Sequence, residues 1–147
     1  MSYLNKISCF AFLSVTLMAC NIAPQKIKYG VNHCNFCDMT VVDKTHAAEY
    51  VTKKGKSYVF DSIECMLHEL NEKNNEQDLA FILVADYQKP AVLIKAKEAS
   101  YLVTDKIKSP MGANLSAFNS LDTAIEMQQK LGGAVYTWQQ IKTAIKK

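Results

Sequence analysis

The sequence predicts an α+β domain of two small, similar lobes, each with two strands followed by a helix, and a final helix at the C-terminus. Three observations support this class. "HAAEYVTKKGKSYVF" has two extended stretches around "KKGK", a turn whose glycine is placed for a hairpin. "FDSIECML" and "FNSLDTAI" share the order aromatic, cap, serine, aliphatic, acid, which indicates an internal repeat, although shared helix-capping rules alone can produce such a match. "LAFILVADY" is an apolar run of the length of a buried strand.

The other elements follow from the same signals. We expect the first helix to begin at "FDSIECML", with Asp61 as its cap and Glu64 three residues later closing a capping box. "AVLIKAK" and "SYLVTD" predict two further strands, and a second helix ends at the glycine pair of "KLGG". "AVYTWQQIKTAIKK" predicts a short strand and an amphipathic helix. The lobes are expected at about residues 31–88 and 89–147.

The first twenty residues resemble an export signal. Lys6 precedes an apolar run that is too short to span a bilayer as a stable helix. "LMAC" resembles the bacterial lipoprotein box, which predicts a signal peptide over residues 1–19, lipidation of Cys20 and a tether over residues 20–30. A plain signal peptide that happens to end near a cysteine is the alternative. Because Asn21 rather than Asp follows the cysteine, resemblance to enteric sorting rules predicts an outer-membrane lipoprotein facing the periplasm rather than one on the inner membrane.

Charge and composition exclude some classes of function. Without Lys6 the basic residues fall from 17 to 16 against 14 acids, a net charge of +2, which argues against a nucleic-acid partner. All the basic residues are lysine, so bidentate arginine clamps are unavailable. We find no acid–base pair, no nucleophile with its base and no phosphate loop. The sequence therefore predicts a monomeric binding protein, not an enzyme.

The stretch "VNHCNFCDMT" concentrates the chemistry of the mature chain, which keeps three cysteines, Cys34, Cys37 and Cys65. An odd number cannot all pair within one chain, and an oxidising compartment does not favour idle thiols. Cys34 and Cys37 have the spacing of a redox dithiol, but the β-branched residues that follow suit an extended segment better than a helix. Zinc is a second alternative, because the three cysteines and one histidine could supply four donors.

Cuprous copper is the third interpretation. Cu(I) is soft and accepts two or three thiolate or thioether donors. In an extended segment, Cys37 and Met39 would lie on the same side of the chain with Asp38 between them, forming a chelating pair. A thioether is a donor that favours copper over zinc, although methionine is more often a core filler than a ligand.

Three motifs, "CNFCDMTVVD", "FDSIECML" and "SPMGANLSAF", follow one another after the lipobox in an order that resembles the NosL family of lipoprotein copper chaperones, which are related in fold to the organomercurial lyase MerB. The resemblance implies a NosL/MerB-like fold and Cu(I) held in the periplasm for delivery towards nitrous oxide reductase or its maturation proteins. It implies Cys37, Met39 and Met111 as copper ligands, with Cys34 as a fourth donor or as a resolving thiol. Asp38 stands where the family usually has glycine. Kinship with MerB, which works through cysteine thiolates and a carboxylate, keeps an enzyme as an alternative.

The remaining candidates are read from their local sequence. Met111 lies in the turn "SPMG", where packing does not require methionine, and pseudo-symmetric lobes would bring it to Met39. Cys65 is expected on the core face of the first helix. His33 adjoins the cysteines and is a candidate transient ligand or partner-side donor. The two later histidines, His46 and His68, are expected to be ordinary polar surface residues.

Overall fold

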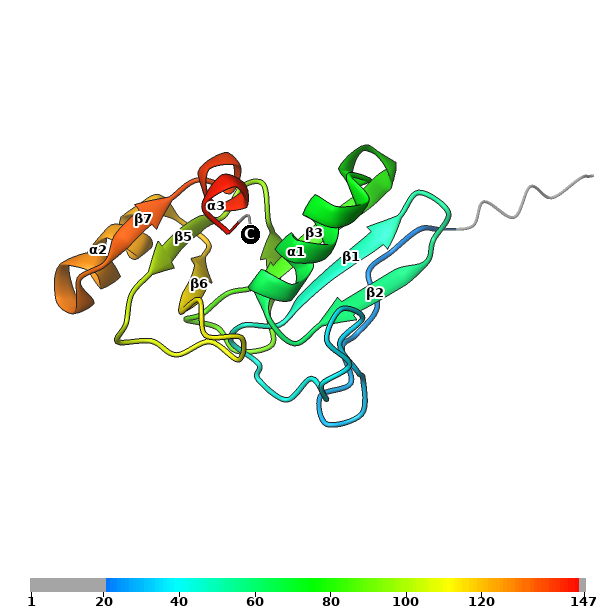
Figure 1. Cartoon of the computed structure of the whole chain (residues 1–147), viewed down its shortest axis with the longest axis horizontal. Coiled ribbons are helices and arrows are strands. Elements are labelled where there is room, and N and C mark those ends of the chain that lie inside the picture. The colour runs from blue at the N-terminus through cyan, green and yellow to red at the C-terminus, as the bar shows by residue number, and fades with distance from the viewer. Residues whose placement is uncertain (1–20, 146–147) are drawn as a thin grey trace, which may run out of the picture.

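The computed structural model describes residues 21–145 (Figure 1). The predicted signal peptide and Cys20 lie outside the described residues. The strands are β1 (Ala48–Thr52), β2 (Ser57–Phe60), β3 (Leu79–Ala85), β4 (Leu93–Lys95), β5 (Ser100–Val103), β6 (Leu115–Phe118) and β7 (Ala134–Tyr136). The helices are α1 (Ile63–Lys73), α2 (Leu121–Leu131), α3 (Trp138–Ala144) and the short 3₁₀ helix η1 (Glu76–Asp78). None of the helices in this part of the chain is long and apolar enough to span a bilayer.

Two antiparallel sheets confirm the predicted α+β class with paired lobes and a C-terminal helix. The first sheet has the order β2-β1-β3-β4 and the second has the order β6-β5-β7. Each sheet has a central strand that pairs antiparallel with the strand after it and, beyond the helix, with a third strand. The same strand-strand-helix-strand unit therefore occurs twice, as the matching helix starts indicate.

The lobes divide later than the sequence suggests. The segment "AVLIKAK" contributes β4, which pairs with β3 in the first sheet and not with the following strand. The partner of β5 is β6, in the segment "LSAF", for which the sequence predicts a connection before the second helix and not a strand. All four side chains of β6 are buried and both α1 and α2 contact it, so this strand does not need the alternation of polar and apolar residues that marks a half-exposed strand.

The start of α1 differs from the prediction in one residue. Ser62, not Asp61, is the N-cap, and its hydroxyl accepts a hydrogen bond from the backbone N–H of Cys65 at 3.2 Å. Ser120 caps α2 in the same way through the N–H of Thr123. Serine is a strong N-cap because its short side chain accepts a hydrogen bond from an otherwise unpaired backbone N–H in the first turn of the helix. Because Ser62 caps the helix, the carboxylate of Asp61 is available for other contacts.

The two lobes share contacts and a common core. Asp86 forms a parallel bridge with Ala117, and the N–H of Tyr87 donates to the carbonyl of Ala117 at 2.9 Å. His46 is buried, contrary to the expected surface position, and its Nε2 lies 3.1 Å from the hydroxyl of Ser116 on β6. His46 Nδ1 also lies 2.8 Å from Asp43 Oδ2, but the contact with Ser116, 70 residues away along the chain, is one that local sequence does not indicate. One apolar cluster includes residues of α1, β5, β6 and α3.

Candidate metal site

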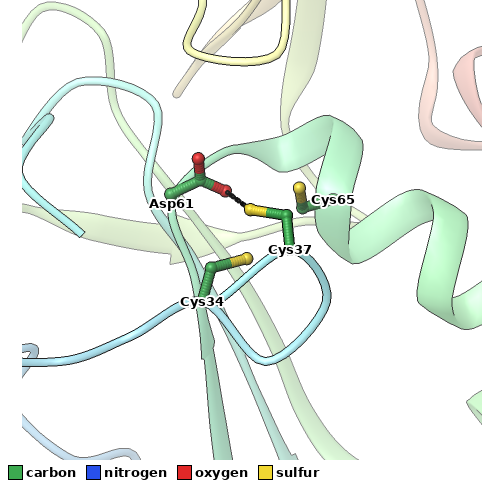
Figure 2. A group of neighbouring side chains, drawn as sticks. All are labelled: Cys34, Cys37, Asp61 and Cys65. Carbon is green, nitrogen blue, oxygen red and sulfur yellow. Dashed lines mark hydrogen bonds between the residues drawn. The ribbon is translucent and has the colours of Figure 1, made fainter. Parts of the chain in front are cut away.

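Three cysteines and one aspartate converge at the start of α1 (Figure 2). The Sγ atoms of Cys34, Cys37 and Cys65 and a carboxylate oxygen of Asp61 all lie within 4.8 Å of one another. Cys34 and Cys65 are buried, whereas Cys37 is half-buried. We call these four residues the thiol–carboxylate cluster. It combines the two cysteines of the C-x-x-C motif with two residues from the end of β2 and the first turn of α1.

Residues 34–39, here called the cysteine loop, form a tight turn and not the expected extended segment. The N–H of Cys34 donates to the carbonyl of Met39 at 2.8 Å, and the N–H of Asp38 donates to the carbonyl of Cys34 at 2.9 Å. Asp38 has a φ of 63°, in the left-handed region that glycine adopts most easily. The chain reverses between Cys37 and Met39, so the prediction that an extended segment places both side chains on one side is wrong.

Side chains of α1 hold the cysteine loop in place. The amide of Asn35 donates to both carboxylate oxygens of Glu69, at 3.0 and 2.7 Å, and its backbone N–H donates to the carbonyl of Val59 at 2.9 Å. The ring of Phe36 stacks on His68, with ring centroids 5.6 Å apart. His68 therefore packs against the cysteine loop, an arrangement that the sequence did not indicate. These contacts order the loop that carries two of the three thiols.

Asp61 brings a carboxylate to the thiols. The thiol of Cys37 donates to Asp61 Oδ1 at 3.5 Å (Figure 2). Asp61 is buried, and its second oxygen, Oδ2, has no hydrogen-bond partner among the described residues. An unpaired buried carboxylate oxygen is costly unless it serves a purpose, such as binding an ion. This oxygen is therefore an independent indication of a metal site.

The thiols differ in acidity because they interact with one another. The hydrogen bond from the Cys65 thiol lowers the pKa of Cys34 to about 6, helped by the backbone N–H groups around it and opposed by burial. The same contact with Cys34, together with burial, raises the pKa of Cys65. Burial also raises the pKa of Cys37. The cluster therefore stabilises a thiolate at Cys34, and a thiolate is the form of cysteine that binds metals.

The two predicted thioether ligands lie on the surface. The side chain of Met39 is 51% exposed and that of Met111 is 40% exposed. Met111 lies in a turn closed by the N–H of Gly112 donating to the carbonyl of Ser109 at 3.1 Å. The Ser109 hydroxyl donates to the carboxylate of Glu64, the residue before Cys65. The structure therefore anchors the Met111 turn, residues 109–112, to the same turn of α1 that bears Cys65.

His33 is a candidate ligand only because it adjoins Cys34 in the sequence. It is exposed, and its Nδ1 lies 3.1 Å from the backbone carbonyl of Asp38. Among the described residues, the group of cysteine, histidine and acid side chains close enough to share an ion does not include it.

Asp61 and Cys65 are site residues that local sequence patterns do not identify. The capping pattern predicts Asp61 as a helix cap, and the apolar stripe of α1 predicts Cys65 as a core residue. Cys65 is buried as expected, but its sulfur faces Cys34 and Cys37. The available signal was the spacing of an acid and a cysteine, four residues apart across a helix start, together with an odd number of thiols.

The shape of the chain resembles a known structure, the crystal structure of the copper chaperone NosL from Shewanella denitrificans. The match has a TM-score of 0.72 and 22% sequence identity, and it covers 84% of this chain and 98% of that one. At this identity the likeness establishes the fold. No curated protein matches the chain. The family model named NosL matches residues 26–145, which is most of the sequence and includes the whole thiol–carboxylate cluster. The chain therefore belongs to the NosL family.

Proposed function

We propose that this protein binds Cu(I) at the thiol–carboxylate cluster and passes it to another protein. The observation that carries the proposal is the convergence of three cysteine sulfurs with a buried, partly unpaired Asp61. Thiolates are preferred ligands of Cu(I), which is satisfied by two or three of them. The solved structure with the same fold is that of a copper chaperone, which supports copper as the cargo.

The exposure of the donors favours transfer over permanent storage. Cys37 is the half-buried thiol of the three, and Met39 and Met111 are exposed soft donors. A ligand from an acceptor protein can reach the ion at Cys37 before the buried thiols of Cys34 and Cys65 release it. We propose that the two thioethers assist this exchange, in line with the ligands that the NosL resemblance implies. The protein would then act as a carrier and not as an enzyme.

The proposal also concerns where the protein is located and which protein receives the copper. We propose that Cys20 is lipidated, that the protein is a monomer on the periplasmic side of the outer membrane, and that the recipient is nitrous oxide reductase or a protein of its maturation. The lipobox "LMAC" supports lipidation, Asn21 after the cysteine supports the outer membrane, and the resemblance to the NosL family supports the recipient. Acyl chains on Cys20 would appear in the mass of the purified mature protein, and transfer would appear as copper in the recipient after separation of the two proteins.

A competition titration tests the copper site. Reduced protein lacking residues 1–20 is titrated with Cu(I) against a chromophoric chelator. Replacing any one of Cys34, Cys37 or Cys65 by serine should lower the affinity by more than about 100-fold, because a ligand is lost and not merely its support. Met127→Ala on α2 is a matched control for the methionine variants and should leave the affinity unchanged.

The same titration separates the alternatives. Met39→Ala and Met111→Ala should each lower the Cu(I) affinity by about tenfold and slow transfer of Cu(I) to the chelator. Unchanged affinity and transfer in both variants would remove the thioethers from the proposal. Unchanged affinity in all three cysteine variants would overturn the site itself. The three thiols and Asp61 also make a four-donor set that zinc can use, so Zn²⁺ is titrated in parallel. Zinc binding that outcompetes Cu(I) would assign the cluster to a structural zinc, and copper-independent disulfide exchange would assign it to a thiol oxidoreductase.

A further inference from the structure

Three exposed lysines crowd the turn between β1 and β2. The hairpin turn, residues 53–56, has the sequence Lys-Lys-Gly-Lys, and all four residues are exposed. The ion pairs formed within residues 21–145 use other lysines, namely Lys73, Lys95, Lys97, Lys130 and Lys142. Lys56 lies 4.7 Å from the ring centroid of Tyr58, and Lys73 lies 5.4 Å from the same centroid. The three lysines line a hollow beside the turn, and Asp78 is the acidic residue among the other residues that line it. The surface is therefore strongly basic.

The first described residues of the N-terminal tether lie beside this surface. Asn21, Ile22, Ala23 and Gln25 line a hollow together with Lys53, Lys54 and Gly55. The backbone N–H of Gln25 donates to the buried carboxylate of Glu49 on β1 at 2.9 Å, which fixes the path of the tether. Figure 1 shows the blue start of the described chain beside the hairpin. Cys20, the predicted lipid anchor, is the residue before Asn21.

The thiol–carboxylate cluster lies at the other end of the sheet. The hairpin turn precedes β2, and Asp61 directly follows it, so the length of this four-residue strand separates the lysines from the cluster. At about 3.3 Å per residue, this separation is on the order of 13 Å. The hairpin turn and the thiol–carboxylate cluster therefore lie at opposite ends of β2.

We propose that the hairpin turn, with Lys53, Lys54 and Lys56, is a membrane-contact surface that binds the anionic phospholipid headgroups of the bilayer that holds the lipid anchor. The inference rests on the proposed lipidation of Cys20, which would bring the turn to the bilayer without further cost in translational freedom. Clustered lysines are attracted to anionic lipid within about one Debye length, and a basic cluster next to an acyl chain is a recurring form of two-part anchoring. The result is a fixed orientation in which the copper site faces away from the membrane.

Lysine footprinting tests this orientation. The lipidated mature chain is reconstituted into vesicles of phosphatidylcholine alone or with about one-third phosphatidylglycerol, and lysines are acetylated briefly and quantified by mass spectrometry. Labelling of Lys53, Lys54 and Lys56 should fall about fivefold on the anionic vesicles. Lys95 and Lys130, which are exposed on other elements, are internal controls and should label equally on both. Protection should vanish in 0.5 M NaCl, because salt screens the attraction.

Each outcome decides the inference. Equal labelling of the hairpin lysines on both vesicles overturns it, as does protection that extends equally to Lys95 and Lys130. Protection on phosphatidylcholine vesicles after addition of inorganic phosphate would assign the surface to free phosphate and overturn the membrane assignment. The mass of the purified chain reports acylation separately. An acylated chain without protection refutes the surface alone, whereas an unacylated chain refutes the anchor and the surface with it; the copper titration is unaffected by either result.

Discussion

Asp38 shows how a single backbone conformation shapes the cysteine loop. Its φ of 63° lets the chain reverse between Cys37 and Met39, so the N–H of Cys34 reaches the carbonyl of Met39. Aspartate tolerates this region better than most residues, whereas a β-branched side chain does not. Glycine, which the resemblance implies is usual in the family, would fit there without strain.

We predict that Asp38→Gly changes the free energy of unfolding by less than about 1 kcal/mol, whereas Asp38→Val lowers it by about 1–2 kcal/mol. Urea denaturation of both variants measures the difference. Equal stability of the two variants would mean that the loop relaxes and that the left-handed conformation is not required.

The glycine pair after α2 offers a matched test of close packing. A Cβ on Gly133 would lie 2.2 Å from the carbonyl oxygen of Val103, whereas a Cβ on Gly132 would meet nothing within 4 Å. Both residues have positive φ, so both alanine variants are strained. We expect Gly132→Ala to lower the free energy of unfolding by about 1 kcal/mol and Gly133→Ala by more than about 3 kcal/mol, measured as shifts of the urea midpoint. A smaller loss in Gly133→Ala than in Gly132→Ala would contradict this packing.

Residue-level predictions succeeded where the signal was local. The turn position and exposure of Met111 followed from the neighbouring proline and glycine and are confirmed. The burial of His46 depends in part on Ser116, and the orientation of Asp61 depends on Cys37; both partners are distant in sequence. No periodicity contains that information. The ligand role of Met39 and Met111 stays a prediction.

At the scale of elements, a hydrogen bond couples the Met111 turn to α1. The hydroxyl of Ser109 donates to Glu64 and accepts from the N–H of Asn114 at 2.8 Å. Glu64 is fully buried, and its other oxygen has no partner among the described residues. Loss of the hydroxyl would leave that carboxylate without a donor, which costs about 1–3 kcal/mol.

We therefore expect Ser109→Ala to lower the free energy of unfolding by about that amount and also to weaken Cu(I) binding by about tenfold, because the turn bearing Met111 loses its attachment. Ser120→Ala, which removes the N-cap of α2, is the control: it should cost about 1 kcal/mol of stability without changing copper affinity. Chelator competition and urea denaturation give both quantities. Weakened stability with unchanged copper affinity in Ser109→Ala would show that the attachment serves the fold only.

The docking of α3 depends on a half-buried carboxylate, that of Glu76. Glu76 of η1 accepts from the indole N–H of Trp138 at 3.1 Å and pairs with Lys97 at 3.1 Å and with Lys142. Burial acts to raise the pKa of Glu76, but the hydrogen bonds from Lys142, Trp138 and Lys97 together outweigh it and hold the pKa below its ordinary value. A lowered folded-state pKa contributes stability above the unfolded pKa of about 4.3, and that stability is lost as the pH falls through the folded pKa.

The free energy of unfolding should therefore fall below about pH 4.5, and it should fall less steeply in Glu76→Gln, which is the less stable protein at pH 7. Urea titrations at several pH values compare the two slopes. Parallel pH profiles for the two proteins would show that Glu76 does not contribute to the acid sensitivity.

Most elements were predictable because helix caps, glycine stops and the hairpin turn are local features. The first helix, its counterpart α2, the hairpin and the final strand and helix all lie where the sequence indicates. The strand β6 was missed because its fully buried side chains show no alternation, and β4 was assigned to the wrong lobe because pairing depends on long-range contacts.

Over the whole molecule, the shared core and the contacts at the junction predict a single cooperative unfolding transition. Trp138, the one tryptophan of the chain, packs beside Tyr101 of the second sheet while its indole bonds to Glu76 in the first half. Its fluorescence should therefore report both lobes, and its urea midpoint should coincide with that of the far-ultraviolet circular dichroism. A tryptophan transition at clearly lower urea would indicate that the second lobe unfolds by itself.

Asn35 and Phe36 hold the cysteine loop against α1 through their contacts with Glu69 and His68. Because these contacts to α1 hold the loop through interactions that need no metal ion, the proposed loading of Cu(I) would not require a segment to fold first. In the proposed transfer, the rate would then depend on ligand exchange at the Cys37 sulfur, the half-buried thiol of the three. An acceptor protein would need to reach only that atom, without a rearrangement of the fold.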